Sequence, residues 1–194
     1  MTADRSEGWD AVGAQFIAAR SGVGGQLIRS WARDNLPRSA AVVDVGCGSG
    51  MPISEALMDE GLAVFGIDAS PTLIAAFKRR FPDTPAACKA AQDSPFFHRQ
   101  FDAAVAVGLL FLLAEDTQHQ IIDRVANALR SGGRFLFSAP REVCEWQDTL
   151  TGRPSRSLGV EQYGRLLHAS GMDLVGGHVD EGRNHYYEAV RRGP

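Results

Sequence analysis

The chain has 194 residues, of which 44% are hydrophobic and 22% are charged, which is typical of one globular domain and excludes general disorder. The formal net charge of −3 excludes a basic surface over the whole domain, so we expect no nucleic-acid partner. The longest apolar run, 103–114, is too short to span a bilayer, and the first ten residues contain no apolar leader. Three widely spaced cysteines without a C-x-x-C pair indicate reduced thiols, so we expect a cytoplasmic protein without a metal site.

Helical and strand-like patterns alternate along most of the chain. Residues 6–35 predict two helices with a break at 21–25. Five short apolar runs then predict buried strands at 41–45, 62–67, 86–91, 101–107 and 134–139. Between them, Ser70 and Pro71 predict the start of a helix over 72–81, and Asp116 or Thr117 predicts the cap of a helix that Gly132 ends.

The last third of the chain departs from this alternation. Residues 141–157 predict an irregular connection, followed by a helix that ends near Ser170. Two strands, 172–179 and 184–190, are joined by a short turn and predict an antiparallel hairpin. The whole pattern predicts an α/β fold with a doubly wound sheet.

The segment at residues 44–50 reads D-V-G-C-G-S-G and follows a predicted strand. Glycines at such a place let a ligand press against bare backbone, and the N–H groups at the start of the next helix favour an anionic group. Asp68 ends the following strand, where a carboxylate suits the two hydroxyls of a ribose. Loop and carboxylate together predict a nucleoside-containing cofactor. A dinucleotide fingerprint needs a glycine where Met51 stands, and no P-loop motif is present.

The run D-x-G-x-G-x-G at residues 44–50 resembles the first motif of class I S-adenosylmethionine-dependent methyltransferases. Asp68 matches the ribose-binding acid of that family, and Asp93, with Ser94 beside it, matches the acid that meets the adenine amine. Residues 101–107 and 129–135 resemble the family's fourth strand and the approach to its fifth.

The resemblance implies a seven-stranded, mostly parallel sheet in the order 3-2-1-4-5-7-6, with an antiparallel seventh strand and an N-terminal helical cap. It also implies a single methyltransferase domain over residues 1–194. Its parts are the cap (1–37), a cofactor-binding core (38–140), and a substrate-side loop, helix and terminal hairpin (141–194). The implied activity is transfer of a methyl group from S-adenosylmethionine to a small-molecule acceptor by in-line displacement, in a monomer or homodimer.

The resemblance also implies roles for individual residues. Asp44 supports the glycine loop and the methionine ammonium, the Gly108 carbonyl faces that ammonium, and Arg20 is the candidate for the methionine carboxylate. The full set of candidate cofactor-binding residues is Arg20, Asp44, Gly46, Cys47, Gly48, Asp68, Ala69, Asp93, Ser94, Gly108 and Leu109. Trp9 and Phe16 are candidates for a lid over the cofactor, or are core residues at helical spacing.

The candidate acceptor residues come from the C-terminal third. The seventh strand begins at the edge where the parallel strands end, which brings His185, Asn184 and Tyr186 near the cofactor's reactive side. His185 titrates near neutrality and is the candidate general base. Trp146 either shapes the acceptor pocket or packs under a solvated loop. The other histidines are expected to be solvated or structural, with His178 as a hydrogen-bonded residue of the sheet.

Two other functions stay open at this point. A nicotinamide-dependent oxidoreductase on a related fold is disfavoured by Met51 and by the terminal antiparallel hairpin. A methyltransferase-like protein that binds without turnover is compatible with the apolar stretch 108–111, where many relatives have a histidine or an asparagine.

Overall fold

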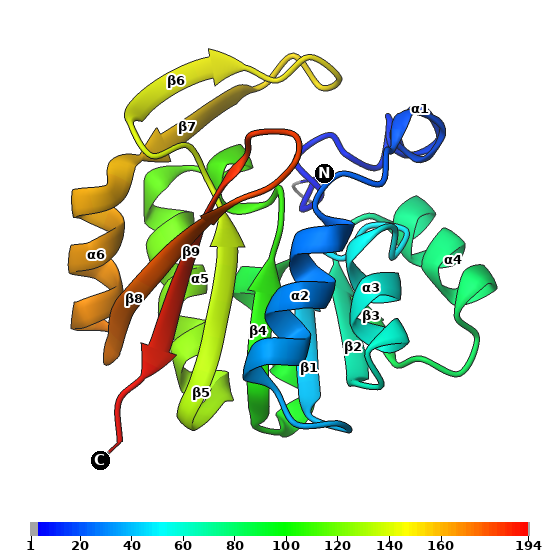
Figure 1. Ribbon diagram of the computed structural model, residues 1–194. Helices are drawn as coiled ribbons and strands as arrows, with labels where there is room; N and C mark the ends of the chain where they lie inside the picture. Colours follow the sequence, from blue (N-terminus) through cyan, green and yellow to red (C-terminus); the bar gives the residue numbers. More distant parts are fainter. Residues whose placement is uncertain (1–3, 194) are drawn as a thin grey trace.

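The computed structural model describes residues 4–193, with one seven-stranded sheet and one two-stranded sheet (Figure 1). The strands of the large sheet are β1 (Ala41–Val45), β2 (Ala63–Asp68), β3 (Ala86–Cys88), β4 (Phe101–Ala106), β5 (Leu129–Ser138), β8 (Met172–Val179) and β9 (His185–Arg191). The small sheet pairs β6 (Val143–Gln147) with β7 (Pro154–Leu158). The α-helices are α1 (Gly13–Ala19), α2 (Gly25–Asn35), α3 (Ile53–Asp59), α4 (Pro71–Arg80), α5 (Glu115–Ala128) and α6 (Gly159–Ala169). The 3₁₀ turns are η1 (Ala91–Asp93), η2 (Phe96–His98) and η3 (Leu110–Leu112).

The large sheet has the strand order β3-β2-β1-β4-β5-β9-β8. Its first five strands are parallel, and β9 is antiparallel to both β5 and β8. The predicted order 3-2-1-4-5-7-6 is therefore confirmed, with β8 and β9 as its sixth and seventh strands. The carboxyl ends of the parallel strands share one edge of the sheet. Figure 1 shows α1 and the β6–β7 hairpin at this same edge.

Each face of the sheet is buried by its own set of helices. On one face, Ile28 and Trp31 of α2 and Leu57 of α3 pack against buried β1 and β4 side chains. On the other, Ile121 of α5 and Tyr163 of α6 join the phenylalanines of β5. Both faces are covered, which is why the central strands read as continuous apolar runs. Among residues 4–193, every helix is too short or too polar to span a bilayer.

The predicted start of α4 is confirmed. The Ser70 hydroxyl accepts a hydrogen bond from the Leu73 N–H at 3.1 Å, and Pro71 occupies the first helical position. The break between the two N-terminal helices is also confirmed, because Gly24 has a φ of +88° and precedes α2. Residues 5–12 form turns rather than the beginning of the first helix.

The predicted irregular connection at 141–157 is wrong, because this segment contains the β6–β7 hairpin. Its turn is closed by the Asp148 carboxylate, which accepts hydrogen bonds from the N–H groups of Leu150 (3.0 Å) and Thr151 (2.7 Å). Strand β6 alternates between exposed and half-buried side chains, whereas Ser155, Ser157 and Leu158 of β7 are buried. Because only one side of the hairpin is covered, its sequence is polar and gives a weak strand signal.

Three predicted boundaries also differ from the structure. The third strand ends at Cys88, since the chain turns into η1 instead of continuing to residue 91. Helix α5 begins after Ala114, without a side-chain cap from Asp116 or Thr117. It ends at Ala128 rather than at Gly132, because Leu129 already pairs with Phe101 of β4. Gly132, with a φ of +75°, lies where the β4–β5 register shifts.

A buried carboxylate on β9 joins the sheet to α2. Glu188 accepts hydrogen bonds from the Trp31 indole (3.0 Å), the Arg134 guanidinium (2.5 Å) and the His178 ring (2.8 Å). Burial alone raises the pKa of Glu188, but the hydrogen bonds from Trp31 and His178 outweigh it and hold the pKa below the ordinary value. His178 is thus a hydrogen-bonded residue of the sheet, as predicted.

We expect Glu188→Ala to lower the free energy of unfolding by about 3 kcal/mol, because it leaves the buried Trp31 N–H and the half-buried Arg134 guanidinium without their acceptor. Glu188→Gln keeps an acceptor and costs less. Urea denaturation measures the stability of both Glu188 variants. Glu161→Ala, at an exposed position of α6, is the control and is expected to change the free energy of unfolding by less than about 0.5 kcal/mol. A Glu188→Ala variant as stable as this control would contradict the structural role.

Candidate functional site

The glycine loop after β1 lies against the end of β2. The N–H groups of Gly46 and Cys47 donate to the Ile67 carbonyl at 2.7 and 3.0 Å, which continues the pairing of the two strands. The Gly48 N–H donates to one oxygen of the Asp68 carboxylate at 2.8 Å, and the Ser70 N–H donates to the other at 2.8 Å. Burial raises the pKa of Asp68, while these backbone hydrogen bonds act to lower it. The carboxylate is thereby fixed beside the loop.

A second carboxylate lies beneath the loop. Asp44 on β1 is 1% exposed and accepts a hydrogen bond of 2.6 Å from the Ser54 hydroxyl of α3. Burial raises the pKa of Asp44 to about 7, against the opposing effect of that hydrogen bond. A carboxylate whose charge is costly in this way is stabilised by any cation bound next to it.

These groups line a concave pocket, here named the first pocket, at the carboxyl edge of the sheet. Its floor is the glycine loop, and its walls include Leu109 and the segment 89–92. Gly108 has a φ of +73°, and a Cβ added there meets no atom within 4 Å, so its backbone borders open space.

The N-terminal segment 4–10, here named the strap, covers the first pocket. Asp10 anchors it to the start of α4 by accepting hydrogen bonds from the Ser70 hydroxyl (2.7 Å) and the Thr72 N–H (2.8 Å). Arg5 forms a 3.0 Å ion pair with Asp93. Glu7 forms an ion pair with Arg153 in the turn of the β6–β7 hairpin. The strap thus links three separate elements around the mouth of the pocket.

Aromatic and basic side chains from the N-terminal region continue this cover. The Trp9 and Phe16 rings meet edge to face, with centroids 5.3 Å apart, and the Arg20 guanidinium lies 5.6 Å from the Phe16 centroid. Arg20 donates through Nε to the Met51 carbonyl at 3.1 Å. Burial lowers the pKa of Arg20, and the nearby carboxylates of Asp44 and Asp180 oppose that effect.

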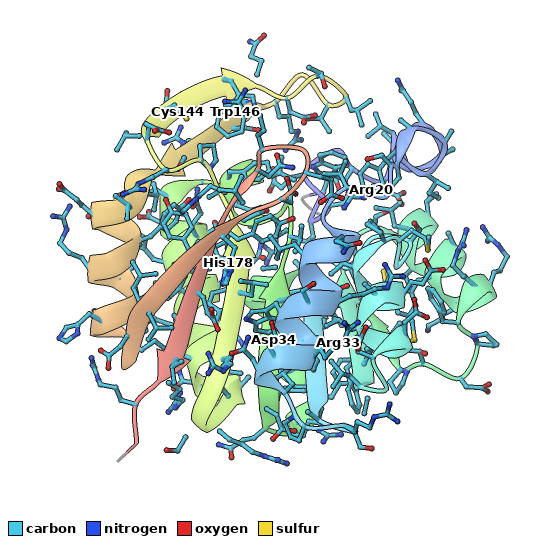
Figure 2. The ribbon with its side chains drawn as sticks, viewed as in Figure 1. Arg20, Arg33, Asp34, Cys144, Trp146 and His178 are labelled. Atoms are coloured by element: carbon cyan, nitrogen blue, oxygen red, sulfur yellow. The ribbon has the colours of Figure 1, made fainter. Side chains whose placement is uncertain are left out.

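A second pocket adjoins the first, and the two share the lining residues Arg20, Val107 and Gly108. The β6–β7 hairpin supplies Trp146, whose ring lies 5.4 Å from that of Phe111. Figure 2 shows Trp146 on the hairpin and Arg20 next to α1, both at the carboxyl edge of the sheet. The second pocket therefore opens onto the space beside the glycine loop.

The terminal hairpin forms the opposite wall of the second pocket. Tyr186 is buried and donates to the Asp180 carboxylate at 3.0 Å, and Glu181 accepts a hydrogen bond of 3.1 Å from the Gly24 N–H. These contacts fix the β8–β9 turn to the start of α2. His185 is half-buried, and its ring meets the Tyr187 ring edge to face at 4.6 Å. Burial lowers the pKa of His185, and the nearby Arg141 charge lowers it further, which favours a neutral imidazole.

Residues 42–133 match the family model described as "Methyltransferase domain". The chain contains a methyltransferase domain. The match includes the glycine loop, Asp68 and the β4 segment, which are the motifs on which the resemblance to class I S-adenosylmethionine-dependent methyltransferases depended. That resemblance is confirmed. A comparison with curated protein sequences finds no match.

Solved methyltransferase structures have the same fold as this domain. The magnesium protoporphyrin IX methyltransferase from Synechocystis, with bound S-adenosylmethionine, has a TM-score of 0.75 at 17% identity, and 98% of each chain is covered. The 1,6-didemethyltoxoflavin-N1-methyltransferase from Burkholderia thailandensis, with its acceptor and S-adenosylhomocysteine bound, has a TM-score of 0.74 at 18% identity, covering 95% of this chain and 84% of that one. A glycopeptide N-methyltransferase complexed with S-adenosylmethionine has a TM-score of 0.70 at 19% identity, covering 87% of this chain and 94% of the other.

The fold brings most of the predicted site residues together in two groups. The first pocket is lined by Trp9, Phe16, Arg20, Asp44, Gly46, Cys47, Gly48, Asp68, Ala69, Gly108 and Leu109. The second is lined by Arg20, Gly108, Trp146, Asn184, His185 and Tyr186. The parallel strand ends and the antiparallel β9 account for most of this grouping, because most of these residues follow or begin strands at one edge. Trp9, Phe16 and Arg20 come instead from the N-terminal region, and Trp146 comes from the β6–β7 hairpin. Their roles in binding and catalysis stay predictions.

Asp93 and Ser94 are outside the lining of the first pocket. Asp93 pairs with Arg5 of the strap, and the buried Ser94 hydroxyl accepts a hydrogen bond of 3.1 Å from the Phe96 N–H. The segment that lines this end is Lys89–Gln92, just before Asp93. An adenine contact from Asp93 stays a prediction.

Two further lining residues, Arg141 and Arg183, are outside the set of candidate site residues. Arg141 follows the end of β5, and Arg183 lies in the turn between β8 and β9. Their signal in the sequence is their place in the connections at the edge where the parallel strands end, which is also where Asp68 lies. Within residues 4–193, no three His, Cys, Asp or Glu side chains gather in an arrangement that could hold a metal ion.

The raised pKa of Asp44 predicts a pH-dependent stability. Between about pH 4 and pH 7 the unfolded chain loses the Asp44 proton while the folded chain keeps it, so stability falls as pH rises through this window. We expect Asp44→Asn, which keeps an acceptor for Ser54, to remove this part of the decline.

Urea denaturation at about pH 4.5, 5.5, 6.5 and 7.5 measures how the free energy of unfolding changes with pH in the wild type and in Asp44→Asn. Asp34→Asn, at an exposed carboxylate of α2, is the control and keeps the wild-type slope. Equal slopes in wild type and Asp44→Asn would contradict the buried proton on Asp44.

Proposed function

We propose that this protein transfers a methyl group from S-adenosylmethionine to a small-molecule acceptor, with the cofactor in the first pocket and the acceptor in the second. The observation that carries the proposal is the contact between the two pockets at Arg20, Val107 and Gly108. One pocket has a glycine loop with two carboxylates, and the other is a separate hollow that opens at its side. The bound ligands of the similar structures support the choice of cofactor.

The residues of the first pocket fit the groups of S-adenosylmethionine. Asp68 is placed for the ribose hydroxyls, and Asp44, whose charge is costly when it is alone, suits the methionine ammonium. Arg20 suits the methionine carboxylate. The bare backbone at Gly108 borders open space, so a ligand can approach it closely.

The chemistry requires orientation more than proton transfer. Bound S-adenosylmethionine supplies a methyl group on a sulfonium, whose carbon–sulfur bond breaks as the acceptor–methyl bond forms, with the bonding electrons remaining on sulfur. The residues of the chain hold the acceptor in line and exclude water, for which the apolar wall at Leu109 and Leu113 is suited. Where the acceptor arrives protonated, neutral His185 takes its proton.

The same proposal includes the finer assignments. The cap (1–37) covers the cofactor, the core (38–140) binds it, and residues 141–194 shape the acceptor site. Free cysteines at 47, 88 and 144 support a reducing compartment, so we propose a cytoplasmic protein that acts as a monomer or homodimer.

Titration calorimetry with S-adenosylmethionine, S-adenosylhomocysteine and NAD tests the cofactor. We expect the first two to bind and NAD not to bind. Tighter binding of NAD would favour the oxidoreductase alternative. A screen of small acceptors with labelled S-adenosylmethionine then tests turnover, and binding without turnover of any acceptor would favour the non-catalytic alternative.

We expect Asp68→Ala to weaken S-adenosylmethionine binding by more than tenfold, because two charge-assisted hydrogen bonds of about 1.5–3 kcal/mol each are lost. Asp83→Ala, at an exposed carboxylate after α4, leaves the affinity unchanged. Calorimetry measures the affinity and thermal denaturation checks the fold. Unchanged affinity in folded Asp68→Ala would remove Asp68 from the site, and Asp93→Ala tests the adenine assignment in the same way.

Gly48→Val is expected to abolish cofactor binding. Gly48 lies at the floor of the first pocket and has a φ of +56°. A Cβ added to it would project into the pocket and come within 3.3 Å of the Phe16 ring in the cover. Gly61→Val is the matched control, because Gly61 has a φ of +79° but open space around its Cβ position, away from the pocket. Both variants carry backbone strain, so a loss of binding in Gly48→Val alone is due to the side chain in the pocket. Normal binding in Gly48→Val would show that the cofactor lies elsewhere.

His185→Ala is expected to reduce turnover about 100-fold or more with a protonated acceptor, while the affinity for S-adenosylmethionine stays the same. The pH–rate profile distinguishes this role from packing, because the acidic limb given by a general base disappears in the variant. An unchanged profile would leave His185 as a packing residue against Tyr187.

A further inference from the structure

The second pocket has an excess of positive charge that methyl transfer itself does not need. Five charged side chains line it, and three of them are guanidinium groups. They are Arg20, Arg141, Arg183, Glu142 and Asp180.

Two of these five groups are already occupied by the protein. The buried Asp180 carboxylate accepts hydrogen bonds from the Tyr186 hydroxyl (3.0 Å), the Asn184 side chain (2.9 Å) and the Asn184 N–H (2.9 Å). Arg20 donates to the Met51 carbonyl of the glycine loop. Asp180 therefore serves to hold the β8–β9 turn and offers little to a ligand.

Arg141 and Arg183 are different, because both are exposed at the mouth of the second pocket. Within residues 4–193, neither has a carboxylate oxygen within 4.0 Å. Glu142 is the one lining carboxylate left to oppose them. Two forked guanidinium groups at one pocket mouth suit the planar, bidentate recognition of a carboxylate.

Part of the lining of the second pocket is aromatic. Trp146 and Phe111 line it with their rings tilted by 45° and half-buried. Flat apolar rings of this kind stack on another ring and fix its plane. At the inner end, the Gly108 N–H donates to the Ser138 hydroxyl at 2.8 Å, which marks the side next to the first pocket.

We propose that the second pocket binds a small aromatic carboxylate as the methyl acceptor. Its ring packs on Trp146 and Phe111, its carboxylate is held by Arg141 and Arg183, and its reacting atom points toward Gly108. This inference rests on the proposed function. It also agrees with the chemistry, since an anionic acceptor is attracted to the positive sulfonium in the neighbouring pocket.

Calorimetry on the full chain saturated with S-adenosylhomocysteine tests this inference. The probes are benzoate, 4-hydroxybenzoate and indole-3-acetate, each compared with its methyl ester, together with cyclohexanecarboxylate and tyramine. We expect the aromatic acids to bind at least tenfold more tightly than their esters, than tyramine and than the aliphatic acid.

Variants separate the two parts of the site. Arg141→Gln and Arg183→Gln each weaken the acids about tenfold and leave the esters unchanged, whereas Trp146→Ala weakens both acids and esters. Arg165→Gln, at an exposed arginine of α6, is the control and changes neither. The affinity for S-adenosylhomocysteine stays the same in all four variants.

The inference and the proposed function fail in different ways. If S-adenosylhomocysteine does not bind, the proposed function is wrong. If S-adenosylhomocysteine binds, three results would each show that the aromatic carboxylate is wrong while the methyltransferase assignment stands. Esters or tyramine bind as tightly as the acids, the arginine variants bind the acids normally, or no acid binds at millimolar concentration.

Discussion

The pairing of β1 with β2 is the constraint on which the site depends. The two strands are in parallel register from Ala41 to Val45, and the pairing continues into the glycine loop through the Ile67 carbonyl. Because both strands end at the same level, Asp68 reaches the Gly48 N–H, and Asp44 lies directly beneath the loop. One register thus places both carboxylates around a bare stretch of backbone. A shift of β2 by one residue would move the Asp68 side chain to the opposite face of the sheet.

The antiparallel insertion of β9 decides the other half of the site. A seventh strand in the parallel direction would begin at the far edge and leave the carboxyl edge without His185. As it is, the β8–β9 turn lies at that edge and is fixed there by the contacts of Asp180 and Glu181. The same strand carries Glu188, whose buried charge binds α2 to the sheet. The acceptor wall and the stability of the domain therefore depend on one strand.

The strap connects the two halves through contacts that stabilise the structure only weakly. Its ion pairs, Arg5 with Asp93 and Glu7 with Arg153, join exposed side chains. Exposed pairs of this kind contribute less than about 1 kcal/mol each and weaken with salt. Asp10 anchors the strap to α4 more firmly, through two hydrogen bonds. The strap is therefore held less firmly at Arg5 and Glu7 than at Asp10.

The strand order, and with it the edge at which His185 lies, came from the resemblance to the methyltransferase family. The sequence by itself determined the alternation of strands and helices and the glycine loop with Asp68. These follow from local signals, because buried parallel strands read as apolar runs and the residues that end them are fixed by chain position. Tertiary structure decided the rest. The β6–β7 hairpin, with Trp146, has one covered side and no apolar run, so only its packing makes it a sheet. The pairing of Asp93 with Arg5, and the presence of Arg141 and Arg183 in the lining of one pocket, depend on how distant segments fold over the sheet. No local pattern contains that information, because each case brings together residues far apart in the sequence.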